Sequence, residues 1–223
     1  AQSLAENAAS AAERHLTAEF LSHYARMDLG VVIARQAARE KIILVQYGYP
    51  APHHAYPSTP EKALILAIAR QESNFDIAAR SSVGARGLMQ LMPPTARAVA
   101  RSVKQPYAEK RLTADPAYNI RLGSAYLNTL LGTFDGSYVL AAAAYNAGPS
   151  RSRQWIRQLG DPRDPAVDAI DWVEKIPFAE TRNYVQRVME NLMVYRAVLD
   201  GSTTVQKTLE NELVRHEEFP APK

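Results

Sequence analysis

The chain of 223 residues contains no cysteine, so it has no disulfide framework, no thiol nucleophile and no cysteine-based metal site. It contains no apolar run that approaches the length of a membrane span. Lysine and arginine form no dense block, and the net charge of +3 is only mildly basic. That charge does not indicate a nucleic-acid partner, whereas weak attraction to an anionic polymer is compatible with it. Alternating β-branched runs are absent too, and the alanine- and leucine-rich composition predicts an all-α chain.

The N-terminal part lacks a charged and then apolar leader, so we expect a processed protein or an excised fragment. Residues 1–27 and 31–45 have apolar residues at helical spacing, with a predicted break at residues 28–30 (DLG). Two such helices resemble one unit of an α-solenoid; an ordinary helical hairpin packed on the main domain is the alternative. Residues 48–60 contain four prolines and are the expected domain boundary. The adjacent His53 and His54 in this segment favour solvated linker histidines over metal ligands.

A predicted helix leads into Glu72. Its start signals are residues 58–61 (STPE), in which Ser58 or Thr59 can cap the helix and Pro60 suits its first turn. The apolar stripe consists of Leu64, Ile65 and Ile68, and the next positions on that face are Gln71 and Glu72. Partial burial and the helix dipole should both raise the pKa of this carboxyl, which suits a general acid. The alternative is that Glu72 simply ends the stripe at the surface.

Glycines break the chain after this helix. Gly84 and Gly87 allow sharp turns and a close approach of the backbone to another chain or a ligand. Met89 and Gln90 then offer an apolar surface beside an amide, a pairing that suits the apolar faces and hydroxyls of a sugar. Further helices are predicted over residues 93–103, 115–134, 137–146 and 177–201, the third apolar all round and thus central in a bundle. Trp172 is expected in the core rather than as a sugar-stacking platform.

Four motifs occur in order along the chain. They are residues 72–73 (ES), 84–93 (GARGLMQLMP), 144–148 (AYNAG) and 180–185 (ETRNYV). Together they resemble the catalytic domain of the soluble lytic transglycosylases, murein-cleaving enzymes related to goose-type lysozyme. The resemblance implies a lysozyme-like helical domain over residues 56–201, preceded over 1–55 by a helical linker or the end of an α-solenoid and followed by a tail over 202–223. It also implies a periplasmic location.

The resemblance further implies the roles of particular residues. Glu72 is the expected catalytic residue, first as acid and then as base, with Ser73 in support. The other expected contacts with the saccharide are Met89, Gln90, Tyr145, Asn146, Glu180 and Tyr184. The implied reaction cleaves the β-1,4 bond between N-acetylmuramic acid and N-acetylglucosamine and closes a 1,6-anhydro ring, with no cofactor or metal. The expected partners are peptidoglycan glycan strands and, beyond them, other cell-wall enzymes.

The sequence leaves two alternatives open. A lysozyme-type hydrolase would need a second, positioned carboxylate, because glycosidases commonly use a pair. The candidates are Asp76, Asp171, Glu174 and Glu180. Asp76 would share a side with Glu72 only if the helix continued, and a first-turn glutamate such as Glu180 usually serves the helix dipole. A non-catalytic glycan-binding module is the other alternative, although such a module has no need of an acid at position 72.

Overall fold

The computed structural model describes residues 10–24 and 26–202 of the chain. Within these ranges it contains helices and turns but no strand, and the β-type pairings there are isolated bridges between Arg80 and Arg86 and between Arg86 and Leu91. The all-α prediction is therefore confirmed. The predicted tail, apart from Ser202, lies outside the described residues.

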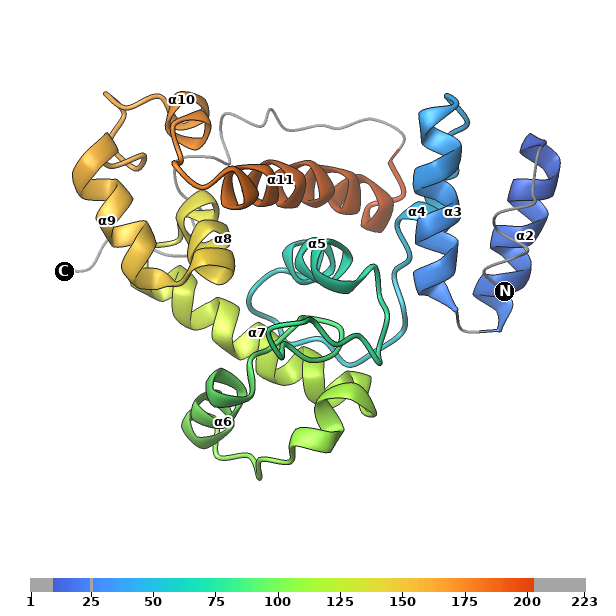
Figure 1. The fold of residues 1–223 in the computed structure, drawn as a ribbon, viewed down its shortest axis with the longest axis horizontal. Helices are drawn as coiled ribbons and strands as arrows, with labels where there is room; N and C mark the ends of the chain where they lie inside the picture. The colour runs from blue at the N-terminus through green and yellow to red at the C-terminus, as the bar shows by residue number, and fades with distance from the viewer. Residues whose placement is uncertain (1–9, 25, 203–223) are drawn as a thin grey trace. The chain divides into compact units, whose positions relative to one another are not determined.

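The helices follow one another along the chain, with long connections over residues 49–61 and 74–92 (Figure 1). They are α2 (Ala11–His23), α3 (Met27–Arg39), α4 (Val45–Gly48), α5 (Lys62–Ser73), α6 (Pro93–Ser102), the 3-10 helix η1 (Glu109–Thr113), α7 (Pro116–Thr133), α8 (Tyr138–Ala147), α9 (Pro149–Leu159), α10 (Ala169–Glu174) and α11 (Ala179–Leu199). The described residues form two compact units: those up to 56 with 68–121, and 57–67 with 122–202. Helices α5 and α7 each contribute to both units.

The first unit contains a small core formed by α2, α3 and α4. Its buried members are Ala18, Leu21, Ile33, Ala34 and Tyr47. The predicted break at residues 28–30 is wrong, because α3 begins at Met27 and runs through them. Asp28 lies in the first turn, where the dipole favours a carboxylate, and Arg26 binds that carboxylate through two nitrogens.

Helix α5 is buried from Ala63 to Arg70, which is why its sequence is apolar almost throughout. Its predicted start at residues 58–60 is wrong: the helix begins at Lys62, and the carbonyl of Glu61 accepts the first helical hydrogen bonds. The carboxylate of Glu61 is bound by the Arg196 guanidinium and, at 2.9 Å, by the Tyr138 hydroxyl. Contacts with residues so distant in sequence fix the start of α5, and local cap signals do not reveal them.

Helices α7 and α8 begin where their cap residues predict. The Asp115 carboxylate accepts from the Tyr118 N–H at 3.0 Å, and the Arg111 guanidinium beside it holds the pKa of Asp115 below its usual value. Ser137 likewise caps α8 through the Leu140 N–H. The apolar residues of α8 up to Ala144 are all buried, and Gly148, with φ of 88°, ends the helix.

Helix α11 lies in the second unit, where it packs against α8 and α10. It begins at Ala179, and the buried residues of its stripe include Val185, Val188, Leu192 and Tyr195. The predicted stripe ends one turn early, because Leu199 is 37% exposed. Among the described residues, no helix is both long enough and apolar enough to cross a membrane.

Candidate active site

Glu72 is the penultimate residue of α5 and is half-buried. The chain leaves the helix abruptly, since Asn74 and Phe75 have positive φ angles of 51° and 70°. A bulky aromatic residue rarely adopts this region, so the turn is held by its surroundings rather than by local preference. The carboxyl of Glu72 therefore stands at the end of a rigid, buried helix rather than on a loop.

Ser73 ties this helix end to the glycine-containing loop. Its hydroxyl donates to the carbonyl of Leu88 at 2.8 Å and accepts from the N–H of Phe75 at 3.1 Å. One side chain thus fixes the strained turn and joins it to residues 84–92. The predicted support of Glu72 by Ser73 stays a prediction, and these bonds give it a physical basis through the backbone.

Asn119 in α7 holds the same loop from the other side. Its amide nitrogen donates to the carbonyls of Arg86 and Leu112 at 3.0 and 2.9 Å, and its oxygen accepts from the Met89 N–H at 2.9 Å. The side chain is fully buried, so each bond replaces one to water that burial removed. Sequence reasoning missed Asn119. The feature that could have indicated a structural role is a polar amide placed directly before the core residue Ile120.

The loop passes so close to Asn119 that position 87 must be glycine. A Cβ on Gly87 would lie 2.5 Å from the Asn119 amide nitrogen and would overlap the carbonyl oxygen of Leu112. Gly84 also has a positive φ, of 98°, but a Cβ there would meet open space. The close approach predicted for these glycines is thus made by Gly87, and its partner is the protein's own backbone and side chain.

Gln90, Met89 and Met92 differ in whether their side chains reach the surface, where a saccharide could contact them. Gln90 is half-buried, and its amide nitrogen donates to the carbonyl of Gly87 at 2.8 Å, which leaves the amide oxygen as the end that can accept from a hydroxyl. Met89 is 0% exposed and packs in the interior, so its predicted sugar contact stays a prediction without surface to support it. Met92, in contrast, is 39% exposed and offers an apolar side chain at the surface.

In the second unit, α8 and the first turn of α11 are joined near the predicted residues Tyr145 and Asn146. The Asn146 side-chain oxygen accepts from the Thr181 hydroxyl at 2.7 Å, and Thr181 is buried. The Tyr145 ring lies 5.3 Å from that of Tyr126, whose pKa is raised by burial. Both predicted residues are half-buried, so they stand at the edge of the core.

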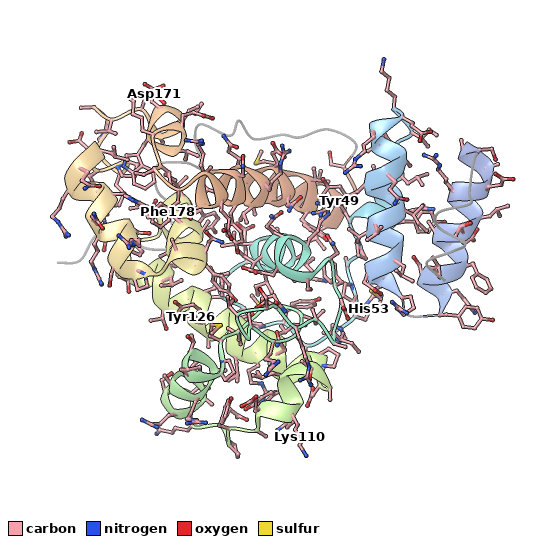
Figure 2. All side chains as sticks on the ribbon, in the orientation of Figure 1. Tyr49, His53, Lys110, Tyr126, Asp171 and Phe178 are labelled. Carbon is pink, nitrogen blue, oxygen red and sulfur yellow. The ribbon has the colours of Figure 1, made fainter. Side chains whose placement is uncertain are left out.

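Glu180 and Tyr184 lie one turn apart on α11 and differ in exposure. Glu180 is exposed in the first turn, whereas Tyr184 is buried. Phe178, directly before this helix, is 45% exposed, and its ring packs edge-on against the buried Trp155 at 5.5 Å. Figure 2 shows Phe178 where α11 begins, beside α8 and α9. Sequence reasoning missed Phe178, although it adjoins the fourth motif.

Three of the four candidates for a second carboxylate have partners elsewhere in the protein. Asp76 lies beyond the end of α5 and accepts from the Ala78 N–H at 2.9 Å, so it does not continue the face of Glu72. On α10, Asp171 pairs with Lys175 at 3.2 Å and Glu174 accepts from Gln186. Convergence of Glu72, Gln90, Tyr145 and Glu180 on one groove stays a prediction.

The two remaining site predictions concern Trp172 and the histidines. Trp172 is buried and donates from its indole N–H to the Gly160 carbonyl at 2.9 Å, which makes it a core residue, as expected. His53 is exposed and His54 half-buried. Across residues 10–24 and 26–202, the histidines, aspartates and glutamates do not gather into a group of three that could hold a metal ion.

A helical domain with one acidic side chain at a buried helix end, beside a glycine loop, is the architecture of a lysozyme-like enzyme. Comparison with known families defines the class further. The family model described as "Transglycosylase SLT domain" matches residues 54–166, and that described as "Soluble lytic transglycosylase helical domain" matches residues 175–203. The chain belongs to the soluble lytic transglycosylase family and is, by class, a lytic transglycosylase domain.

Individual relatives agree with this assignment. The soluble lytic murein transglycosylase of Escherichia coli K12 is 40% identical over 146 residues, covering 65% of this chain and 22% of that protein. The Salmonella typhimurium relative of the same description is 42% identical over 132 residues, 59% of this chain and 20% of the relative. The chain thus spans between a fifth and a quarter of the length of these curated relatives.

Solved structures extend the similarity to most of the chain. The 70 kDa soluble lytic transglycosylase of Escherichia coli matches with a TM-score of 0.77 and 31% identity, over 96% of this chain and 33% of that one. An inactive mutant of the lytic transglycosylase Slt from Pseudomonas aeruginosa, in which glutamine replaces a glutamate, matches with a TM-score of 0.73 and 35% identity. That match covers 86% of this chain and 31% of that one.

Proposed function

We propose that this protein cleaves the β-1,4 bond between N-acetylmuramic acid and N-acetylglucosamine in peptidoglycan and releases 1,6-anhydro-muramyl products. The observation that carries the proposal is Glu72 at the strained end of a buried helix, inside the segment that matches the transglycosylase family model. The murein named in the descriptions of the relatives supports this substrate. We assign the catalytic domain to residues 56–201 and the site of action to the periplasm.

Glu72 serves as both acid and base in the proposed mechanism. Its protonated carboxyl gives a proton to the leaving glycosidic oxygen, and the cation that develops at the anomeric carbon is stabilised by the substrate's own acetamido oxygen. The ionised Glu72 then takes the proton from the 6-hydroxyl of the muramic acid, which closes on the anomeric carbon. Water is not consumed, so a second carboxylate to activate water is not required. An inactive glutamate-to-glutamine mutant of the Pseudomonas aeruginosa relative supports the need for one glutamate.

The other residues of this proposal position the sugar, and they include Asn119 and Met92, which the sequence did not predict. Ser73 and Asn119 hold the turn and the loop that adjoin Glu72, and the Gln90 amide oxygen accepts from a sugar hydroxyl. Met92 supplies the apolar surface. Tyr145, Asn146 and Glu180, which belong to the second unit, contact the sugar in this proposal, while the buried Tyr184 supports them from the core.

The test is the Glu72→Gln variant with purified murein. The amide is nearly isosteric, so the fold and saccharide binding should persist while cleavage falls by at least about 10²–10⁴-fold, the contribution of a general acid and base. Mass spectrometry of the unmutated protein's products should show 1,6-anhydro ends, each one water lighter than a hydrolytic product. Digestion in isotopically heavy water separates the outcomes: reducing ends that carry the heavy oxygen would make the protein a hydrolase. Undiminished cleavage by the variant would remove Glu72 from the mechanism.

A further inference from the structure

Helix α9 carries three arginines and no acidic residue. Arg151, Arg153 and Arg157 are all exposed. Other arginines of the described chain have carboxylate partners, among them Arg111, Arg163 and Arg187. Within the part of the chain that the structure describes, the ion pairs include none of the three on α9. The helix therefore presents positive charge that the protein's own carboxylates do not neutralise.

Arg151 is the least expected of the three, because it lies in the first turn of α9. The partial positive charge of a helix N-terminus disfavours a cation there, whereas Arg157 lies in the last turn, where the dipole favours it. The Arg151 guanidinium donates to the neutral side chain of Gln154 at 3.1 Å and lies 5.2 Å from the centre of the Phe178 ring. The helix dipole therefore disfavours an arginine at position 151, and residues that are locally unfavourable in this way are expected at functional positions.

The surroundings of Arg151 are those of the predicted saccharide site in the second unit. Asn146 is separated from α9 only by Ala147 and Gly148, and its hydrogen bond to Thr181 joins the end of α8 to the start of α11. Phe178 precedes that same turn and is held edge-on by Trp155. The Arg151 guanidinium thus lies close to the exposed Phe178 ring, where α8 ends and both α9 and α11 begin.

An exposed aromatic ring with a guanidinium over it suits a sugar that carries a carboxylate. The apolar face of a pyranose packs on an exposed ring, and guanidinium groups match the geometry of a carboxylate through paired N–H donors. Glu180 in the next turn can accept from hydroxyls but repels a carboxylate, so the anionic group is expected on the Arg151 side. Murein strands carry carboxylates on the lactyl group of peptide-free muramic acid or on the stem peptide.

We propose that Arg151 and Phe178 form a subsite that binds a carboxylate-bearing saccharide unit of the murein strand, with Phe178 packing on the ring and Arg151 binding the carboxylate. The subsite rests on the proposed function, since it names the part of that substrate which these two residues recognise. Arg151 contributes affinity for the anionic strand and takes no part in proton transfer. Its removal should therefore raise KM for such strands and leave kcat nearly unchanged.

The experiment measures binding by isothermal titration calorimetry in the Glu72→Gln background, which avoids turnover. Three oligosaccharides of equal length serve as probes: a neutral N-acetylglucosamine oligomer, a peptide-free murein oligomer with lactyl carboxylates, and a murein oligomer with stem peptides. Adding Arg151→Gln should weaken binding of a carboxylate-bearing oligomer about tenfold, the loss expected for a charge-assisted hydrogen bond, and of the neutral oligomer less than twofold. The murein oligomer that responds identifies the source of the carboxylate.

Arg157→Gln is the matched control, because it removes the same charge from the same helix on another face. It should leave the affinities for all three oligosaccharides unchanged. Phe178→Leu should weaken binding of all three, because packing of a sugar on the ring does not depend on the charge of the sugar. Equal losses for neutral and anionic oligomers in Arg151→Gln, or the same loss in Arg157→Gln, would overturn the subsite. Murein cleavage by the unmutated protein is measured in parallel. Cleavage without an Arg151 effect refutes the subsite alone, whereas an absence of both cleavage and binding refutes the proposed function and the subsite with it.

Discussion

Replacement of Gly87 by alanine should destabilise the protein far more than the same change at Gly84. Both glycines have positive φ angles, 70° and 98°, so each substitution carries a conformational cost of about 1–3 kcal/mol. At Gly87 the new methyl group would also overlap the Leu112 carbonyl and displace the Asn119 amide nitrogen. Loss of that nitrogen's bond to the Leu112 carbonyl leaves a buried oxygen unpaired, at about 1–3 kcal/mol, whereas the Arg86 carbonyl keeps its bond from the Leu91 N–H. We therefore expect Gly87→Ala to cost at least about 2 kcal/mol more than Gly84→Ala.

Urea denaturation followed by circular dichroism measures this difference, with Gly84→Ala as the matched control. Murein cleavage by the folded fraction of Gly87→Ala should also fall, because the loop it distorts is bound to Ser73, the neighbour of Glu72. Equal free energies of unfolding for the two variants would show that the loop moves away from Asn119 at little cost. Asn119 and Gly87 would then not be the residues that fix this loop.

Two further predictions concern the segment before α5. The Arg70 side chain is 7% exposed, donates to the Gly48 carbonyl at 2.6 Å and lies over the Tyr49 ring. Arg70→Leu should therefore lower the free energy of unfolding by about 1–3 kcal/mol and speed hydrogen exchange around residues 45–56. Unchanged exchange in that segment would contradict the anchoring role of Arg70. Burial raises the pKa of Tyr56, whose hydroxyl donates to the Pro52 carbonyl, to about 12. Because the folded pKa exceeds the unfolded value, the associated stability is complete below about pH 10 and is lost as the pH rises through 12. Tyr56→Phe should therefore lessen the fall in melting temperature over that range, and an identical fall in both proteins would refute the assignment.

Helix positions that depend on neighbouring residues could be predicted from the sequence. Asp115 and Ser137 start α7 and α8 as expected, because a cap acts within its own turn. The start of α5 was misplaced because it depends on Arg196, 135 residues away from Glu61. No pattern within a helical window contains such information.

In the candidate site, too, residues marked by local sequence could be predicted, whereas those that depend on distant contacts could not. The motifs indicate Glu72, Ser73 and Gln90, since the end of a stripe and the glycines that follow it are visible in sequence. The exchange of Met89 for Met92 as the exposed methionine could not be foreseen, because both are equally apolar and only packing separates them. Asn119 and Phe178 could not be predicted either, because they contact loops and helices that are distant in sequence.

The ion pair between Glu61 and Arg196 has a consequence for the order in which the protein can mature on the ribosome. The start of the helix that carries Glu72 is held by a residue near the end of α11, so its anchoring must wait until almost all of the described chain has been synthesised. Contacts between residues so far apart close long loops and slow folding. Nascent chains that stop before α11 should lack a fixed start of α5, and the murein-cleaving activity proposed for this protein should appear only late in its synthesis.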